Sequence, residues 1–323
     1  MNALLVSMSS GFSTRGQTIS YKTSLSMISS LTDGMTNLPK DVKDAVSKCR
    51  AATQDALKSQ TSRMDIEFPV GTKFGVEKYP KVKSSDGAPT KNTLDTSDRE
   101  LARLFVDMFQ PVGGENIVVA FSDSNLAEAA KKKWKGDPSA SSRIMAMNRR
   151  KVAKNKTKSK ARGFAAKMAA EVEDSTDSGP FQLPEGTQVA LFVSPGPKEL
   201  VVIEKLCNEV GMGTCIILLN ARLSKISNFG TDSAEKLFTE EFESVFCLSA
   251  APQEAAPNCL LYHAYPGKWT LARKPKVGQP KSILTQEKRP TAEECKQSFD
   301  SLVLTDLEKG VEDAIENVAS WFR

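Results

Sequence analysis

Four polar residues with complementary chemistry follow three apolar segments of the sequence. The segments are 117–121, 189–193 and 214–219, and the residues behind them are Asp123, Ser194, Asn220 and Arg222. If the segments are neighbouring parallel strands, their carboxyl ends share the edge of the sheet at which α/β proteins bind ligands. A carboxylate, a hydroxyl, an amide and a guanidinium at that edge could hold a small polar or phosphorylated ligand. The alternative is structural, because Asp and Ser often cap the helix after a strand and Asn often lies in turns.

The usual sequence signatures of catalysis and of cofactor binding do not occur in this chain. There is no G-x-x-x-x-G-K-[ST] loop and no G-x-S-x-G motif, and Gly211-Met212-Gly213 follows a helical pattern instead of opening one. The single histidine, His263, has neither a nucleophile nor an orienting acid beside it in the sequence, which favours a packed, hydrogen-bonded histidine over a catalytic triad. The six cysteines form no C-x-x-C pair, which argues against a structural zinc site and a disulfide scaffold. We expect no cofactor and no metal, and we favour a protein that is not an enzyme.

A strongly basic segment interrupts the chain. Residues 131–170 contain fourteen Lys or Arg and one acid, so their net charge is +13, whereas the whole chain carries only +5. Alternating basic residues would spread charge around any helix, so we expect a solvated arm that binds an anionic partner, either an anionic membrane surface or RNA. A solvated insertion without a single partner is the alternative. The candidate arm residues are Arg149, Arg150, Lys151, Lys154, Lys156, Lys158, Lys160 and Arg162.

The start of the sequence has the composition of a targeting segment. Residues 1–32 contain no Asp or Glu, carry Arg15 and Lys22, and are rich in Ser and Thr. Such a composition is typical of an organelle transit peptide, and we predict a transit peptide or unstructured leader over 1–34. The apolar stretch 3–6 is shorter than the roughly 7–15 residues of a secretory signal. Composition does not distinguish a plastid from a mitochondrion.

The elements that must position the polar residues alternate in type. The three apolar segments are apolar on both faces, and amphipathic helical patterns follow the first two, which is typical of a parallel sheet covered on both sides. Before them we expect a helix from Pro39, a half-buried strand over 64–68, and a helix that Thr96, Ser97 or Asp98 caps. After about residue 230, strands at short spacings indicate antiparallel pairing. The bond before Pro266, between two of these strands, is expected to be trans.

These patterns predict the fold class. We expect an α/β fold with a mixed, largely parallel sheet, helices on both faces, an antiparallel edge and a long basic insertion at about 131–180. One domain over 35–323 and a C-terminal helix over 307–322 complete the prediction. Hydrophobic residues make up 40% of the chain, as in globular proteins, and no apolar run approaches the roughly 18 residues that cross a bilayer.

The order of several motifs resembles a family built on a domain of unknown function from plastids and cyanobacteria. The family includes a low-photosystem-II-accumulation assembly factor and the C-terminal region of a chloroplast adenylate-kinase-like protein. The Tyr-Pro-Gly-x-Trp stretch at 265–269 is the most specific of the matching pieces. The others are Ala45 to Phe68, Phe121-Ser122-Asp123, Ser194-Pro195, 219–223, 242–248 and Arg289-Pro290-Thr291. The chain departs from the family pattern at Ala221, where a Pro is usual, and near His263, where an Arg is usual.

The resemblance implies a chloroplast protein of the stroma or of the stromal face of the thylakoid. It implies a role in photosystem assembly, above all of photosystem II, or in thylakoid biogenesis, with photosystem or thylakoid protein subunits as partners. It brings no catalytic residues with it. Two other functions stay open from the residues: a nucleotide- or phosphate-ligand-binding α/β protein, and an RNA-associated plastid protein.

Overall fold

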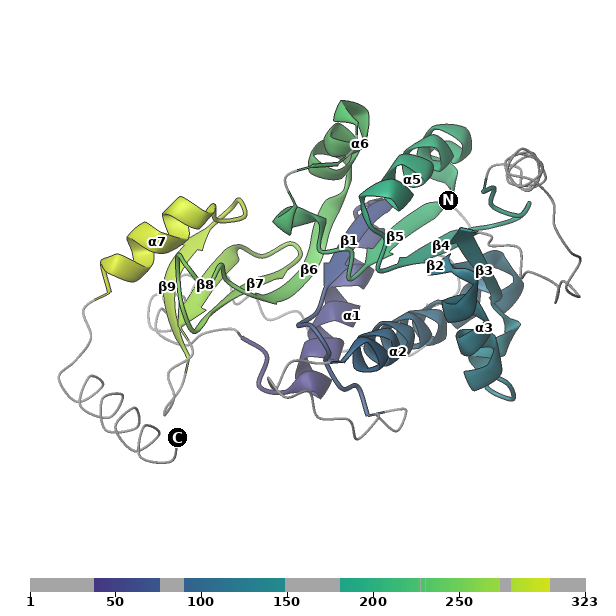
Figure 1. Cartoon of the computed structure of the whole chain (residues 1–323), viewed down its shortest axis with the longest axis horizontal. Helices are drawn as coiled ribbons and strands as arrows, with labels where there is room; N and C mark the ends of the chain where they lie inside the picture. The colour runs from purple at the N-terminus through teal and green to yellow at the C-terminus, as the bar shows by residue number, and fades with distance from the viewer. Residues whose placement is uncertain are drawn as a thin grey trace, which may run out of the picture. The chain divides into compact units, whose positions relative to one another are not determined.

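The computed structural model describes residues 38–75, 90–148, 181–226, 228–229, 231–273 and 280–302 (Figure 1). These residues form two compact units, and each is described by itself. The first unit comprises the described residues of Met1–Ser59, Glu67–Thr72 and Ser244–Arg323, and the second comprises those of Gln60–Ile66 and Lys73–Glu243. The leader, the basic arm from Arg149 to Arg162 and the C-terminal helix lie outside the described residues. They stay predictions, as does the single domain over 35–323.

A parallel sheet forms the centre of the second unit. Its strands follow the order β3–β2–β4–β5–β1, and every neighbouring pair is parallel. The strands are β3 (Arg143–Asn148), β2 (Ile117–Asp123), β4 (Val189–Val193), β5 (Cys215–Leu219) and β1 (Arg63–Glu67), whose last residue, Glu67, belongs to the first unit. The three apolar segments lie side by side as β2, β4 and β5, as the sequence predicts. Every residue of β4 and β5 is buried, which explains why neither strand alternates with polar residues.

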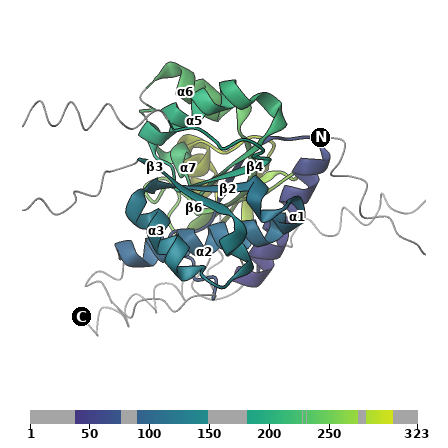
Figure 2. The same ribbon diagram turned by 90° about the vertical axis from the view of Figure 1, so that its right-hand side faces the viewer.

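Helices cover both faces of this sheet (Figures 1 and 2). One face carries α5 (Pro197–Val210) and α6 (Asp232–Lys236), and the other carries α2 (Lys91–Phe109) and α3 (Ser124–Lys133). From α5, Leu200, Ile203 and Leu206 join a core with Phe192 and Leu218 of the sheet. Their spacing of three residues places them on one side of the helix.

Short helices and one further strand complete the second unit. The 3-10 helices are η1 (Gln110–Val112), η2 (Gly114–Asn116), η3 (Pro138–Ser141), η4 (Gly211–Gly213) and η5 (Leu223–Lys225), and η6 (Leu237–Glu241) is a π-helix. Residues 131–148, the first part of the expected basic insertion, belong to α3, η3 and β3 or to the turns between them. Strand β3, which forms an edge of the sheet, was not predicted from the sequence.

α2 begins earlier than the sequence predicts. The helix starts at Lys91, because the hydroxyl of Thr90 accepts the amide N–H of Thr93 (3.3 Å) and caps it there. The predicted cap at 96–98 is therefore wrong, and Asp98 lies within the helix.

β1 is buried along its whole length, so the prediction of a half-buried strand is wrong. Its charged residues have partners inside the protein. Arg63 donates to the carbonyl oxygen of Thr214 (2.8 Å) and to that of Gly211, the residue that ends α5. A cation is stabilised there because the last carbonyl groups of a helix carry partial negative charge.

The first unit combines an antiparallel sheet with two helices. Its strands pair in the order β6–β7–β8–β9. The elements are α1 (Val42–Lys58), β6 (Glu243–Ala250), β7 (Cys259–Ala264), β8 (Trp269–Arg273), β9 (Lys281–Gln286) and α7 (Ala292–Asp300). Cys295 of α7 packs with Cys259, Leu261 and Leu271 of the sheet in a small apolar core. The peptide bond between Tyr265 and Pro266, expected to be trans, is cis.

The predicted fold class is confirmed. The described residues form a mixed α/β fold with parallel strands between two layers of helices and antiparallel strands in its last part. Within the described ranges, no helix is both long and apolar enough to span a membrane.

Candidate functional site

The polar residues at the ends of β4 and β5 meet a carboxylate from α2. The amide Nδ2 of Asn220 donates to Oδ1 of Asp98 (2.7 Å), and Nη2 of Arg222 lies 3.3 Å from the same oxygen. The hydroxyl of Ser194 donates to the backbone carbonyl of Asn220 (3.4 Å). We call Asp98, Ser194, Asn220 and Arg222 the strand-end cluster. Three of the four residues expected at this edge thus come together around Asp98, which was not among the predicted site residues.

The sheet register sets the positions of Ser194 and Asn220. Val193 and Leu219 are directly opposite partners, so β4 and β5 end at the same level. The N–H of Ser194 then donates to the carbonyl of Leu219 (2.7 Å), and the N–H of Asn220 donates to the carbonyl of Ile66 (2.8 Å). Each residue extends the sheet hydrogen bonding by one position before the chain turns.

The backbone turns sharply at these strand ends. Ser194, Asn220 and Arg222 have φ values of 49°, 54° and 54°, in the left-handed region that residues other than glycine rarely adopt. Among the other described non-glycine residues, only Gln60 and Asn258 have positive φ. Asn tolerates this conformation better than most residues, whereas such backbone costs of order 1–3 kcal/mol per residue and is often found at functional sites.

Asp98 is a carboxyl group in a buried but polar setting. It is only 7% exposed. Burial raises its pKa, while the charge of Arg222 and hydrogen bonds from Asn220, Ser194 and Arg222 act in the opposite direction. The side chain of Arg222 is 21% exposed, and its Nε is buried without a hydrogen-bond partner in the described part of the chain.

Asp123, the fourth residue of the predicted set, has a structural role. Its Oδ1 accepts the N–H groups of Asn125 (2.9 Å) and Leu126 (3.0 Å), which caps α3. The structural alternative therefore describes Asp123 correctly. Its negative charge is also one of the smaller causes that raise the pKa of Asp95 in α2.

Asp95 is a second acid that was not predicted as a site residue. It lies three residues before Asp98 in α2 and therefore on the same side of the helix. Burial raises its pKa first, and the charges of Asp98 and Asp123 raise it further, against Lys91 and Arg99. The sequence signal for this site is a pair of acids, Asp95 and Asp98, three residues apart. The Thr-Ser dipeptide between them is typical of a helix cap, so the pair was interpreted as part of a cap and not as part of a site.

The cluster offers hydrogen-bond donors and acceptors within a small region. Carboxylates accept, the guanidinium and the amide donate, and the hydroxyl does both. Nowhere in the described ranges do three or more His, Cys, Asp or Glu gather in a way that suits a metal ion. Such donors and acceptors can recognise polar groups on an organic molecule.

Comparison with known proteins gives one match. The model of a family described as a domain of unknown function, DUF1995, matches residues 39–297. The chain belongs to this family. No curated protein and no solved structure matches it. The matched range of the DUF1995 protein includes the whole strand-end cluster and parts of both described units.

The histidine of the DUF1995 protein lies in the first unit among chemically active side chains. His263 in β7 is the direct partner of Cys247 in β6, and its ring stacks on Trp269 with centres 4.7 Å apart. Arg289 lies over the same indole, 5.0 Å from its centre, and 3.7 Å from the carboxylate of Glu67. A sequence cannot show such neighbours, since Cys247 and Glu67 come from other strands.

This arrangement supports packing more than catalysis. His263 is 4% exposed, and the thiol of Cys247 is directed to Oε2 of Glu67 (3.9 Å). Burial lowers the pKa of His263, and the backbone groups of Ser244 and Lys268 partly oppose that shift. Neither ring nitrogen makes a hydrogen bond of standard geometry with the described residues. The histidine is packed, as predicted, but the predicted hydrogen bonds are not found and stacking on Trp269 is its main contact.

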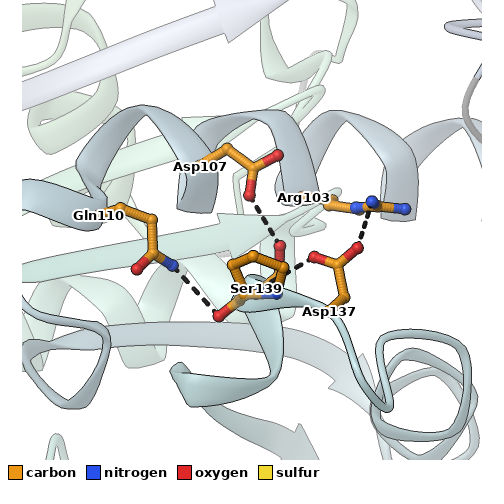
Figure 3. Close-up of polar contacts among 6 residues, drawn as sticks. Arg103, Asp107, Gln110, Asp137 and Ser139 are labelled. Atoms are coloured by element: carbon orange, nitrogen blue, oxygen red, sulfur yellow. Dashed lines mark hydrogen bonds and ion pairs between the residues drawn. The ribbon is translucent and has the colours of Figure 1, made fainter.

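A polar contact in the second unit of the DUF1995 protein anchors the segment that leads to β3. Figure 3 shows Arg103 and Asp107 of α2 and Gln110 of η1 facing Asp137 and Ser139. Arg103 pairs with Asp137, the hydroxyl of Ser139 donates to Asp107 (3.0 Å), and Gln110 donates to the carbonyl of Pro138 (3.3 Å). These contacts hold η3 against α2, so we interpret them as structural and not as part of a catalytic or binding site.

Proposed function

We propose that this DUF1995 protein is a plastid assembly factor. It acts without catalysis on photosystem or thylakoid protein subunits, above all those of photosystem II, in the stroma or at the stromal face of the thylakoid. The observation that carries the proposal is the DUF1995 match over 39–297, because the pieces that resemble the plastid family lie within it. The acid-free, Ser- and Thr-rich leader supports import into an organelle, and the family resemblance points to the plastid.

The basic arm from Arg149 to Arg162 supplies a way to stay near the membrane. Eight basic residues stand in this stretch of the sequence without an acid among them. Each Lys or Arg close to an anionic membrane surface contributes about 1 kcal/mol of attraction, and salt screens it. The arm would concentrate the protein where photosystem subunits are inserted.

Affinity purification from plastids tests the proposal. The full chain with a C-terminal tag is expressed in a photosynthetic host, thylakoids are solubilised at low salt, and co-purifying proteins are identified by mass spectrometry. Photosystem subunits should be enriched over a tagged stromal control. In a matched variant, the eight basic residues of the arm are changed to Gln. This variant should still enter plastids, but it should recover smaller amounts of photosystem subunits from the membrane fraction. Exclusion from plastids, or purification without photosystem or thylakoid subunits, would contradict the proposal.

A further inference from the structure

The ends of β2 and β4 flank a reversal in the order of the strands. The chain leaves β2 toward β3 on one side and leaves β4 toward β5 on the other. The connecting helices α3 and α5 lie on opposite faces of the sheet (Figure 2). In open parallel sheets, ligands bind beyond the carboxyl ends of the strands at such a switch point.

The polar side chains beside this point, at the ends of β4 and β5 and on α2, differ in burial. Asp98 and Asn220 are buried and form a hydrogen bond with each other. Asp95, Ser194 and Arg222 are half-buried, and we call these three residues the rim. Arg222 directs one terminal nitrogen to Asp98, and a guanidinium group carries five N–H donors in all.

The charges of the rim favour a neutral ligand over a phosphate. The positive charge of Arg222 is already 3.3 Å from the carboxylate of Asp98, and Asp95 and Asp123 add two acids nearby. A second anion at Arg222 would be repelled by these carboxylates in a partly desolvated site. A hydroxyl group needs both a donor and an acceptor, and the rim supplies the acceptor Asp95, the donor Arg222 and the two-way hydroxyl of Ser194.

We propose that the carboxyl edge at β4 and β5 binds a small molecule through two neighbouring hydroxyl groups. Asp95 accepts from them, Arg222 donates to them, and Asp98 with Asn220 holds Arg222 in place. Such a pair of hydroxyls occurs on a free sugar and on the ribose of a nucleoside. The proposal stands apart from the assembly function and does not depend on it.

Ligand-observed NMR on the full chain tests the binding, because it detects weak ligands directly. The probes are D-ribose, adenosine, their 2-deoxy and 2′-deoxy forms, and inorganic phosphate. At least one of the first two should show saturation transfer, and its deoxy form should bind about ten-fold more weakly. Binding of ribose and adenosine alike points to a sugar site, and binding of adenosine alone points to a nucleoside.

Three variants separate a ligand site from a structural contact. Asp95→Asn and Ser194→Ala change the rim without removing the Asp98–Arg222 pair, and each should weaken binding about ten-fold while urea unfolding changes little. Asp232→Asn, at an exposed aspartate of α6, is the matched control and should bind as the wild type does. Three results would overturn the proposal: no hydroxylated probe binds, the deoxy forms bind equally well, or Asp95→Asn leaves the affinity unchanged. Binding of phosphate alone would overturn it as well.

Discussion

A methyl group at Gly114 has no room in the second unit. A Cβ atom at this position would lie 1.9 Å from Oγ and 2.5 Å from Cβ of Ser141. Rotation of the Ser141 side chain moves its hydroxyl but not its Cβ, so the backbone of η2 or η3 has to shift. Overpacking of this kind costs about 1–3 kcal/mol. The smaller entropy of the unfolded alanine chain offsets roughly 0.4–1 kcal/mol, so we expect Gly114→Ala to lower the free energy of unfolding by about 1–2 kcal/mol.

Urea unfolding of the full chain, followed by fluorescence and circular dichroism, measures this change. Ser141→Gly removes both close atoms, so Gly114→Ala should cost little or nothing in that background. Gly213→Ala is the matched control, because the added Cβ would meet no atom within 4 Å beyond its chain neighbours and the φ of Gly213 is not in the left-handed region. It should leave stability unchanged or raise it slightly. If Gly114→Ala costs as much with Gly at 141 as with Ser, contact with Ser141 is not the cause and the reasoning fails.

Three further outcomes follow from the buried groups. Arg63→Met should lower the free energy of unfolding by about 3 kcal/mol in urea titrations, because buried carbonyl oxygens such as that of Thr214 lose their charged donor; a change below about 1 kcal/mol would contradict this. For Asp98, burial raises the pKa in the folded chain, so the folded chain binds the proton more tightly than the unfolded chain does. This stabilisation is complete below the unfolded pKa and is lost as pH rises through the folded pKa. The wild type should therefore gain stability relative to Asp98→Asn from pH 7 toward about pH 4, and a constant difference would refute the shift. Burial also raises the thiol pKa values, to about 11 for Cys207 and about 12 for Cys215, so Ellman's reagent at neutral pH should label no cysteine before unfolding and six after it; fast labelling of the folded chain would contradict this.

The central strands could be predicted because burial on both faces leaves a mark in the sequence. β2, β4 and β5 read as continuous apolar runs, and their parallel pairing follows from the helices between them. The edge strands β3 and β9 were missed, since each is partly exposed and carries polar or charged residues that hide any apolar run. β1 was predicted to be half-buried because charged residues alternate with apolar ones in it. These charged residues are in fact buried, with partners elsewhere in the chain.

The strand-end cluster was predictable only in part. Ser194, Asn220 and Arg222 follow strands, so topology alone brings them to one edge. Asp98 lies inside a helix, 122 residues before Asn220 in the sequence. No local sequence pattern indicates that its carboxylate contacts the strand ends. The same limit applies to Cys247 and His263, which become neighbours only through strand pairing.

The accumulation of photosystem II in a host that lacks this chain tests the central claim most directly. Immunoblots of core subunits, normalised to an unrelated thylakoid complex, give the readout. We predict that photosystem II falls in the null strain, that the wild-type chain restores it, and that the chain with the neutralised arm restores it less. Unchanged photosystem II in the null strain would contradict the role in photosystem assembly that we propose for this DUF1995 protein.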